Sequence, residues 1–232
     1  SSLKNREYIR VKIGKVDGNT IVTPLDRKAG SLFSLSESDG YIIIDRNIEG
    51  YNRGDLVDVI LHKPIPKEIF DNRLVSIGSH DIVLDVLNDL FAKDNMTTRI
   101  SSSHVGSLAG LKALSVGDCL IAPSHLLDEK GSYNNDAIKL FFDEDEVSKI
   151  NVVGRRQGIY VAKGNPLEIK SIEDLLDKKM VNRQRGAGTR LLFDYLLKEE
   201  GIDAELIEGY DNEVTIHLSA ALAVKNGDCD FS

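Results

Sequence analysis

Tryptophan is absent from this 232-residue chain, and cysteine and histidine are scarce. The two cysteines, Cys119 and Cys229, lie far apart, so they form neither a disulfide framework nor a metal-binding spacing. Each follows Gly-Asp and opens an apolar stretch, and we therefore expect two buried thiols. The five histidines show no H-E-x-x-H or similar pairing. The sequence thus predicts no metal site.

Long apolar runs are also missing. No run approaches the roughly 20 residues that a membrane-spanning helix needs. The first ten residues lack the apolar core of a signal peptide. The composition, with 41% hydrophobic and 28% charged residues, is typical of a soluble globular protein. We therefore expect a cytoplasmic protein with no membrane partner.

Positive charge is in deficit. The chain holds 29 Lys and Arg residues against 37 Asp and Glu, and the net charge is −8. Most of the acidic excess lies beyond residue 70. Such a field repels phosphate backbones, so nucleic acid is not an expected partner. Any anion site must work through local donors against this field.

The stretch Met180–Leu192, MVNRQRGAGTRLL, lacks the two best-known glycine motifs for nucleotides. A P-loop requires a lysine directly after its last glycine, and Thr189 follows Gly188 instead. A dinucleotide fingerprint requires a third glycine, where this stretch has Leu191. Nucleotide binding therefore has no motif support.

What this stretch does contain is typical of an anion site. A short apolar run stops at Gly186 and Gly188 and continues as a helix, which leaves backbone N–H groups without carbonyl partners. Thr189 adds a hydroxyl at a cap-like position, and Arg185 and Arg190 add charge. The alternative is an ordinary helix start with arginines in solvent.

Residues 8–62 read as all-β. Short runs rich in β-branched and aromatic residues alternate with Gly-containing turns, a pattern typical of a small barrel or sandwich. About 60 residues are marginal for an independent core, so this part should lean on a neighbouring domain or a partner, and a homodimer is one candidate. The expected strands are Tyr8–Ile13, Thr20–Pro24, Tyr41–Ile44 and Leu56–Leu61.

From Arg73 the pattern changes to alternating strands and helices, which predicts a parallel α/β domain. Expected strands lie at 74–77, 98–101, 119–123, 152–153, 158–162 and 205–207. Expected helices lie at 82–91, 108–114, 136–147, 171–176, from 189 to 200, and 213–225. Three strand-to-helix turns share small hydroxyls and free N–H groups: Gly78–His80, Ser103–Ser107 and Arg185–Thr189. In an open parallel sheet, ligands bind at such turns.

The N-terminal part resembles a known family. Its turn and strand residues are similar to those of the C-terminal β-barrel domain of molybdopterin molybdenumtransferase, and this resemblance implies a fold and a pathway but no catalytic residue. The matching positions are Gly30-Ser31, Ser34-Leu35-Ser36, Asp39-Gly40, Gly54-Asp55 and Val57-Asp58-Val59.

The remainder resembles the type II periplasmic-binding-protein-like family, in the branch associated with molybdopterin biosynthesis. The resemblance rests on Ser79-His80-Asp81, Ser103 to Leu111, His125 to Asp128 with Tyr133-Asn134, Arg156-Gln157-Gly158, Gly164-Asn165-Pro166, Asn182 to Arg190 and Thr215-Ile216-His217. In phosphate receptors of this fold a similar Gly-x-Gly-Thr turn holds the anion. The family's return segment after the strand that begins at Cys229 is missing, which implies a C-terminally truncated second lobe.

Together these observations predict a multi-domain β plus α/β protein. We expect a β-barrel over residues 1–66, a linker over 67–72 and a two-lobed domain over 73–232. Pro64 and Pro66, just before the linker, favour an extended connection. Lobe one runs from about 73 to 155, and lobe two from about 165 to 232. The predicted ligand-binding residues are Ser79, His80, Ser103, Ser107, His125, Arg185, Gly186, Ala187, Gly188 and Thr189.

The resemblance implies a protein of molybdenum-cofactor biosynthesis that binds molybdate or tungstate for sensing or delivery. Its expected partners are the small anion and molybdenum-cofactor assembly proteins, with no tightly bound cofactor. Two alternatives stay open: part of a molybdopterin molybdenumtransferase that binds a pterin or organic anion, or a transporter solute receptor. Whether the parent protein is an enzyme is also left open, because the chain shows no nucleophile with a base, no paired carboxylates in a pocket and no metal cluster.

Overall fold

The structure is a computed structural model, which describes residues 5–25, 37–94 and 96–232. The resemblance at Gly30-Ser31 and Ser34-Leu35-Ser36 therefore lies outside the described residues. The chain divides into two compact units. The first unit comprises residues 1–124 and 137–146, and the second comprises 125–136 and 147–232. The predicted domain and lobe boundaries stay predictions.

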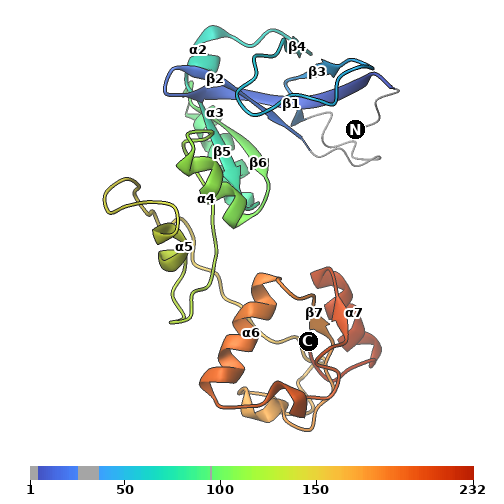
Figure 1. The fold of residues 1–232 in the computed structure, drawn as a ribbon. Coiled ribbons are helices and arrows are strands. Elements are labelled where there is room, and N and C mark those ends of the chain that lie inside the picture. The colour runs from blue at the N-terminus through green and yellow to red at the C-terminus, as the bar shows by residue number, and fades with distance from the viewer. Residues whose placement is uncertain (1–4, 26–36, 95) are drawn as a thin grey trace. The chain divides into compact units, whose positions relative to one another are not determined.

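A curled, mixed sheet forms the framework of the first unit (Figure 1). Its six strands have the order β4-β3-β1-β5-β6, and β2 pairs with β1. The neighbours of β1 in the N-terminal part are antiparallel, whereas β5 and β6 are parallel. The strands are β1 (Glu7–Val16), β2 (Asn19–Pro24), β3 (Gly40–Ile44), β4 (Ile60–Leu61), β5 (Arg73–Gly78) and β6 (Arg99–His104).

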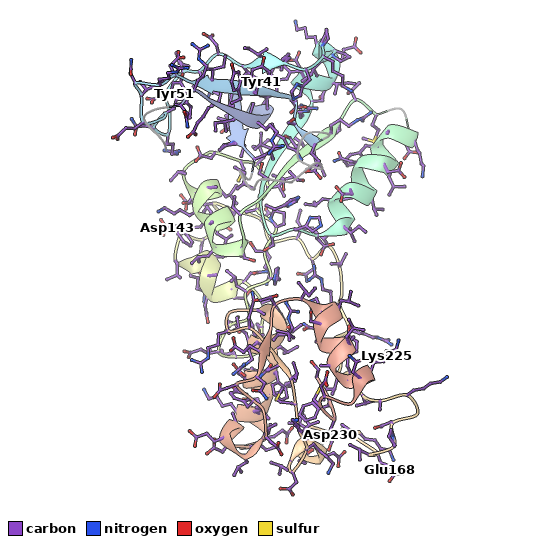
Figure 2. The ribbon with its side chains drawn as sticks, turned by 90° about the vertical axis from the view of Figure 1, so that its right-hand side faces the viewer. Tyr41, Tyr51, Asp143, Glu168, Lys225 and Asp230 are labelled. Carbon is purple, nitrogen blue, oxygen red and sulfur yellow. The ribbon has the colours of Figure 1, made fainter. Side chains whose placement is uncertain are left out.

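The predicted β-rich N-terminal part is confirmed in its first three strands. Ile9 and Val11 alternate along β1 with more exposed residues, and they pack with the buried isoleucines of β3. Asp17 and Gly18, both at positive φ, make the two-residue turn between β1 and β2. The ring of Tyr41, labelled in Figure 2, has its centroid 5.6 Å from that of Tyr8, and the two ring planes are tilted by 60°.

The predicted strand Leu56–Leu61 is wrong over most of its length, because only Ile60 and Leu61 pair, with β3. Val57 and Val59 still pack against the sheet core. Leu56 is 99% exposed. Two valines of the segment are thus partly buried without pairing, and backbone pairing begins only at the end of the segment.

Two helices flank the parallel strand pair. α3 (Ile82–Lys93) follows β5 and α4 (Ser107–Ser115) follows β6, and the two helices lie on opposite faces of the pair (Figure 2). α4 packs very closely on β5, because a Cβ added to Gly110 would lie 2.5 Å from the Ile77 carbonyl oxygen. Cys119 joins the core beneath α4, and burial raises the pKa of its thiol to about 11. The expected buried thiol is confirmed.

Two further expectations for the middle of the chain are wrong in detail. The segment 119–123 runs along β5 through Ile77 N–H to Ile121 O and Ser79 N–H to Pro123 O, but it forms only an isolated bridge. The helix expected over 136–147 is the five-residue α5 (Asn135–Lys139). The acidic run that follows turns instead, since the backbone N–H of Asp143, labelled in Figure 2, donates to the Glu146 carboxylate.

The second unit packs two helices and two 3₁₀ turns around a small core. Two parallel strands, β7 (Asn182–Arg183) and β8 (Glu213–Val214), lead into α6 (Gly188–Glu199) and α7 (His217–Asn226). Phe231, 1% exposed, bridges to both Val161 and Met180 in the core. Cys229 is buried, as expected. Lys225 lies in the last turn of α7 (Figure 2), where a cation favours the helix dipole.

Several predicted boundaries in this unit are wrong. The strand expected at 205–207 is the 3₁₀ turn η2 (Ala204–Leu206), which the Asp203 carboxylate caps through the Glu205 N–H. The helix expected at 171–176 is the 3₁₀ turn η1 (Glu173–Leu175), before which the Ser171 N–H donates to the Asp174 carboxylate. The stretches 152–153 and 158–162 form no strand beyond one bridge at Val161. The last helix begins at His217 and not at 213, because residues 213–214 pair as β8.

Candidate functional sites at the carboxyl ends of parallel strands

The first unit brings three predicted site residues together at one sheet edge. β5 and β6 are in register, with Gly78 opposite His104, so the turns that follow them lie side by side. Ser79 Oγ lies 2.6 Å from Ser107 Oγ, and both residues are buried. His80 Nδ1 lies 3.3 Å from His104 Nε2. His104 was not among the predicted ligands, although its place at the end of a serine-rich strand was a signal for it.

The two helices that start at this edge differ in their capacity for an anion. Asp81 caps α3, since its carboxylate accepts from the Val83 N–H, and this fixed negative charge occupies the helix start. The N-cap of α4 is Gly106, which has no side chain to offer. Bonding within α4 starts at the Gly110 N–H, so the amides of its first turn lack helical acceptors. An anion is therefore favoured at α4 and disfavoured at α3.

Within this pair, the surroundings of His104 favour its neutral form. The pKa of His104 lies below its ordinary value because burial, and then the nearby His80 and Lys12, disfavour the imidazolium. Neutral imidazoles can each donate one hydrogen bond and accept one. Ser103, also predicted as a ligand, is 4% exposed within β6, one residue before His104.

The second unit repeats this arrangement with both helix starts uncapped by side chains. β7 and β8 are in register at Arg183 and Val214, and each strand leads into a helix. The N-caps of α6 and α7 are Ala187 and Ile216, neither of which makes a side-chain cap bond. The positive ends of the α6 and α7 helix dipoles thus both follow the carboxyl ends of the paired strands β7 and β8. This is the strongest local preference for an anion that the described backbone provides.

Five of the residues predicted to bind a ligand lie at or beside the start of α6: His125, Gly186, Ala187, Gly188 and Thr189. A Cβ added to Gly188 would lie 3.4 Å from His125 Cδ2, so the imidazole packs directly on this glycine. Gly186 has a φ of 83°, which favours glycine. The Ala187 N–H already donates to the Gln184 carbonyl, which removes one predicted donor. Thr189 is inside the helix and not at its cap, and its Oγ1 is buried without a partner among the described residues.

The arginines of this stretch have different roles. Arg190 is 3% exposed, bonds Asp194 at 2.9 Å and stacks over the Tyr210 ring at 4.0 Å. The expectation that it adds charge to the anion site is therefore wrong, because it is a buried structural residue. Arg185, with a side chain 77% exposed, pairs with Asp211 at 3.2 Å and lies 3.6 Å from Glu213.

Sequence reasoning missed one basic pair. Arg183 Nη1 lies 2.8 Å from both ring nitrogens of His217, the first residue of α7. Arg183 Nη2 donates to the Thr215 carbonyl, while its Nε is buried without a partner, and no carboxylate pairs with it among the described residues. Burial and Arg183 hold the pKa of His217 below its ordinary value. The pairing of β7 with β8 brings these two residues together, and two-residue strands have no pattern from which that pairing could be predicted.

A cavity of about 390 Å³ adjoins the start of α6 within the second unit. Its walls are largely apolar, from the buried side of α6 and from segments around residues 157–161 and 169–172. Thr189, Gln157 and Lys170 supply the polar part of the lining. Among the described residues, no group of three or more metal-ligating side chains is found, and no helix is long and apolar enough to cross a bilayer.

Comparison with known families decides the class of this chain. The model of the PBP superfamily domain matches residues 88–232, more than half of the chain. The chain belongs to the PBP superfamily. A second model, the MoeA C-terminal region (domain IV), matches residues 1–62 of this PBP superfamily member. Both resemblances inferred from the residues are confirmed at this level.

Individual relatives of this PBP superfamily member agree with the two matches. It is 36% identical over 159 residues to the uncharacterized protein YvgK of Bacillus subtilis, which covers 67% of this chain and 51% of YvgK. It is 42% identical over 64 residues to the putative molybdopterin biosynthesis protein MJ0666 of Methanocaldococcus jannaschii, which covers 27% of this chain and 15% of that protein. The chain thus spans about half or less of the curated relatives that it matches.

One solved structure also shows a likeness. The periplasmic aliphatic sulphonate binding protein SsuA of Escherichia coli aligns with a TM-score of 0.40 and 18% identity, over 69% of this chain and 53% of SsuA.

Proposed function

We propose that the α/β part of this chain binds a small oxyanion, with molybdate or tungstate as the leading ligand, for sensing or delivery in molybdenum-cofactor biosynthesis. The observation that carries the proposal is the start of α6. There a buried threonine hydroxyl, with no partner in the described part of the chain, stands in the first turn of a helix whose N-cap makes no side-chain bond. Buried polar groups in native proteins are nearly always hydrogen-bonded, so Thr189 Oγ1 is suited to a ligand oxygen.

Physical chemistry supports an oxyanion at this place. The first hydrogen bond of α6 runs from the Leu191 N–H to the Ala187 carbonyl, so the amides of residues 188–190 have no acceptor within the helix. Convergent N–H and hydroxyl donors suit a tetrahedral oxyanion, and the helix dipole favours its charge. Arg183, which lacks a carboxylate partner among the described residues, adds a cation at the end of β7. Binding of an oxyanion needs no catalytic base.

The link to molybdenum rests on the N-terminal part. Residues 1–62 match the MoeA C-terminal region, and a molybdopterin biosynthesis protein is similar over 64 residues. The proposal includes the N-terminal barrel and the two-lobed receptor fold expected from the resemblance. It also includes molybdenum-cofactor assembly proteins as partners, a homodimer and a cytoplasmic location, each as a prediction.

Thermal unfolding with matched oxyanions tests the proposal. Molybdate, tungstate, sulfate and phosphate are compared at equal ionic strength. A ligand at about 100 times its dissociation constant stabilises the folded state by roughly 2.7 kcal/mol, a midpoint rise on the order of 5 to 10 °C at this size. A rise with molybdate or tungstate alone supports the proposal. Equal rises with all four anions, or none, would refute it.

A second candidate, an organic anion such as a pterin, is favoured by the cavity beside Thr189. About 390 Å³ is far more than a tetrahedral oxyanion fills, and its largely apolar lining suits a ring system. The same unfolding assay with a pterin carboxylate separates the candidates. Stabilisation by the pterin and not by molybdate or tungstate would assign the site to the organic anion and favour a role within a molybdenumtransferase.

A further inference from the structure

The first unit contains a cavity larger than that beside α6, and it lies at the amino ends of the parallel strands β5 and β6. The cavity holds about 530 Å³ and is lined by residues at the beginnings of β5 and β6 together with parts of α2 (Lys67–Asp71), α3 and the chain before α2. The serine and histidine turns described above follow the other ends of the same six-residue strands. At about 3.3 Å per residue the two edges are roughly 17 Å apart, so this cavity is separate from the candidate oxyanion sites.

Apolar side chains form part of its wall. Pro64, Ile65 and Pro66 line it from the chain before α2, and Ile69 and Ile100 contribute from α2 and β6. The prolines have fixed φ angles and no N–H groups, so they do not pair with a neighbouring strand here. An apolar wall of this kind suits the body of a small organic molecule.

The charges at this cavity are unevenly satisfied. Arg73 pairs with Asp39 at 2.7 Å, with both side chains largely buried, and Asp89 pairs with a lysine of α3 at 2.6 Å. The two lining carboxylates are thus already engaged. Arg99, in register beside Arg73, bonds only two main-chain carbonyls, and Lys63 has no hydrogen bond or ion pair among the described residues. Two cations beside an apolar wall thus have no counter-charge among the residues that the structure describes, in a chain of net charge −8.

We propose that this cavity binds an organic anion, with its apolar body against the proline and isoleucine walls and its carboxylate or phosphate group on Lys63 and Arg99. The volume lies within the range of about 300–1,000 Å³ that is typical of small-molecule sites. A ligand of this kind satisfies both unpaired cations and covers the apolar wall. Neither a bare oxyanion nor a neutral ring does both.

Titration with three probes tests this assignment. The probes are 1-naphthyl phosphate, the neutral 1-naphthol and inorganic phosphate, and binding is followed by the methyl NMR signals of Ile69 and Ile100. Naphthyl phosphate should shift these signals and bind at least tenfold more tightly than either partial probe. Lys63→Gln should weaken it roughly fivefold, as the loss of one exposed ion pair predicts. Lys67→Gln, an exposed lysine outside the lining, should leave its affinity unchanged.

Three results would overturn the assignment: equal affinity for naphthol and naphthyl phosphate, unchanged affinity in Lys63→Gln, or shifts confined to methyl groups of the second unit. A Thr189→Val variant separates this site from the proposed oxyanion site. Naphthyl phosphate should bind that variant with wild-type affinity, whether or not the variant has lost molybdate binding.

Discussion

Replacing Thr189 with valine should make the ligand-free protein more stable and the ligand bind less tightly. Valine keeps the branched shape and has a similar helix propensity, so the change removes chiefly the hydroxyl. That hydroxyl is buried without a partner among the described residues, and an unsatisfied buried polar group costs about 1–3 kcal/mol. We therefore expect α6 to gain on the order of 1 kcal/mol of local stability in the absence of ligand.

Ligand binding should change in the opposite direction. A hydrogen bond to a charged group contributes about 1.5–3 kcal/mol, so Thr189→Val should weaken molybdate or tungstate binding by roughly 10-fold or more. Hydrogen exchange of the α6 amides measures the local stability, and calorimetric titration measures the affinity. Thr97→Val is the matched control, because Thr97 is exposed to solvent. Lower stability of α6, or unchanged affinity, in Thr189→Val would refute this account of the site.

Three other changes test separate parts of the structure. Gly110→Ala should destabilise the first unit by about 3 kcal/mol in urea unfolding, because its Cβ would meet backbone atoms of β5, whereas Gly154→Ala, with open space around it, should cost less than about 0.5 kcal/mol. Arg183→Gln should weaken oxyanion binding more than Arg185→Gln in the same titration, since Arg185 already has two carboxylates near it; the reverse order would place the anion elsewhere. The pKa of His104 is lowered in the folded chain, so below about pH 6.5 the unfolded chain binds more protons and the free energy of unfolding decreases as the pH is lowered. His104→Gln should make the thermal midpoint less dependent on pH in this range, and an unchanged dependence would contradict this account.

The sequence predicted the first unit better than the second. In β1, β-branched residues alternate with polar ones, and Asp17-Gly18 selects a tight turn, so pattern and turn chemistry together indicate the pairing of β1 with β2. β3 is instead a run of isoleucines that pairs antiparallel with β1. In the second unit, β7 and β8 have two residues each, too few for any periodicity. The 3₁₀ turn at Ala204–Leu206 resembles a strand in composition, and the cap at Asp203 decides against it.

For the candidate sites, the sequence predicted the turns but not the partners of their polar groups. Glycine turns between a strand and a helix were visible in the sequence, and the structure places Ser79 with Ser107 and His125 with Gly188. The partner of each polar group was not visible, because partners come from segments distant in the chain. His217 meets Arg183 only because the strands before them pair.

The three arginines within residues 183–190 show why composition alone misassigns an anion site. All three lie close to the start of α6, yet their surroundings differ. Arg190 is buried between Asp194 and the Tyr210 ring, and Arg185 is held in solvent by acidic residues before and within β8. In an acidic chain most arginines find a carboxylate, and an arginine so paired must lose that partner before it can hold an anion. Arg183 faces His217 and a main-chain carbonyl instead, so it can accept a ligand's charge without breaking an existing ion pair.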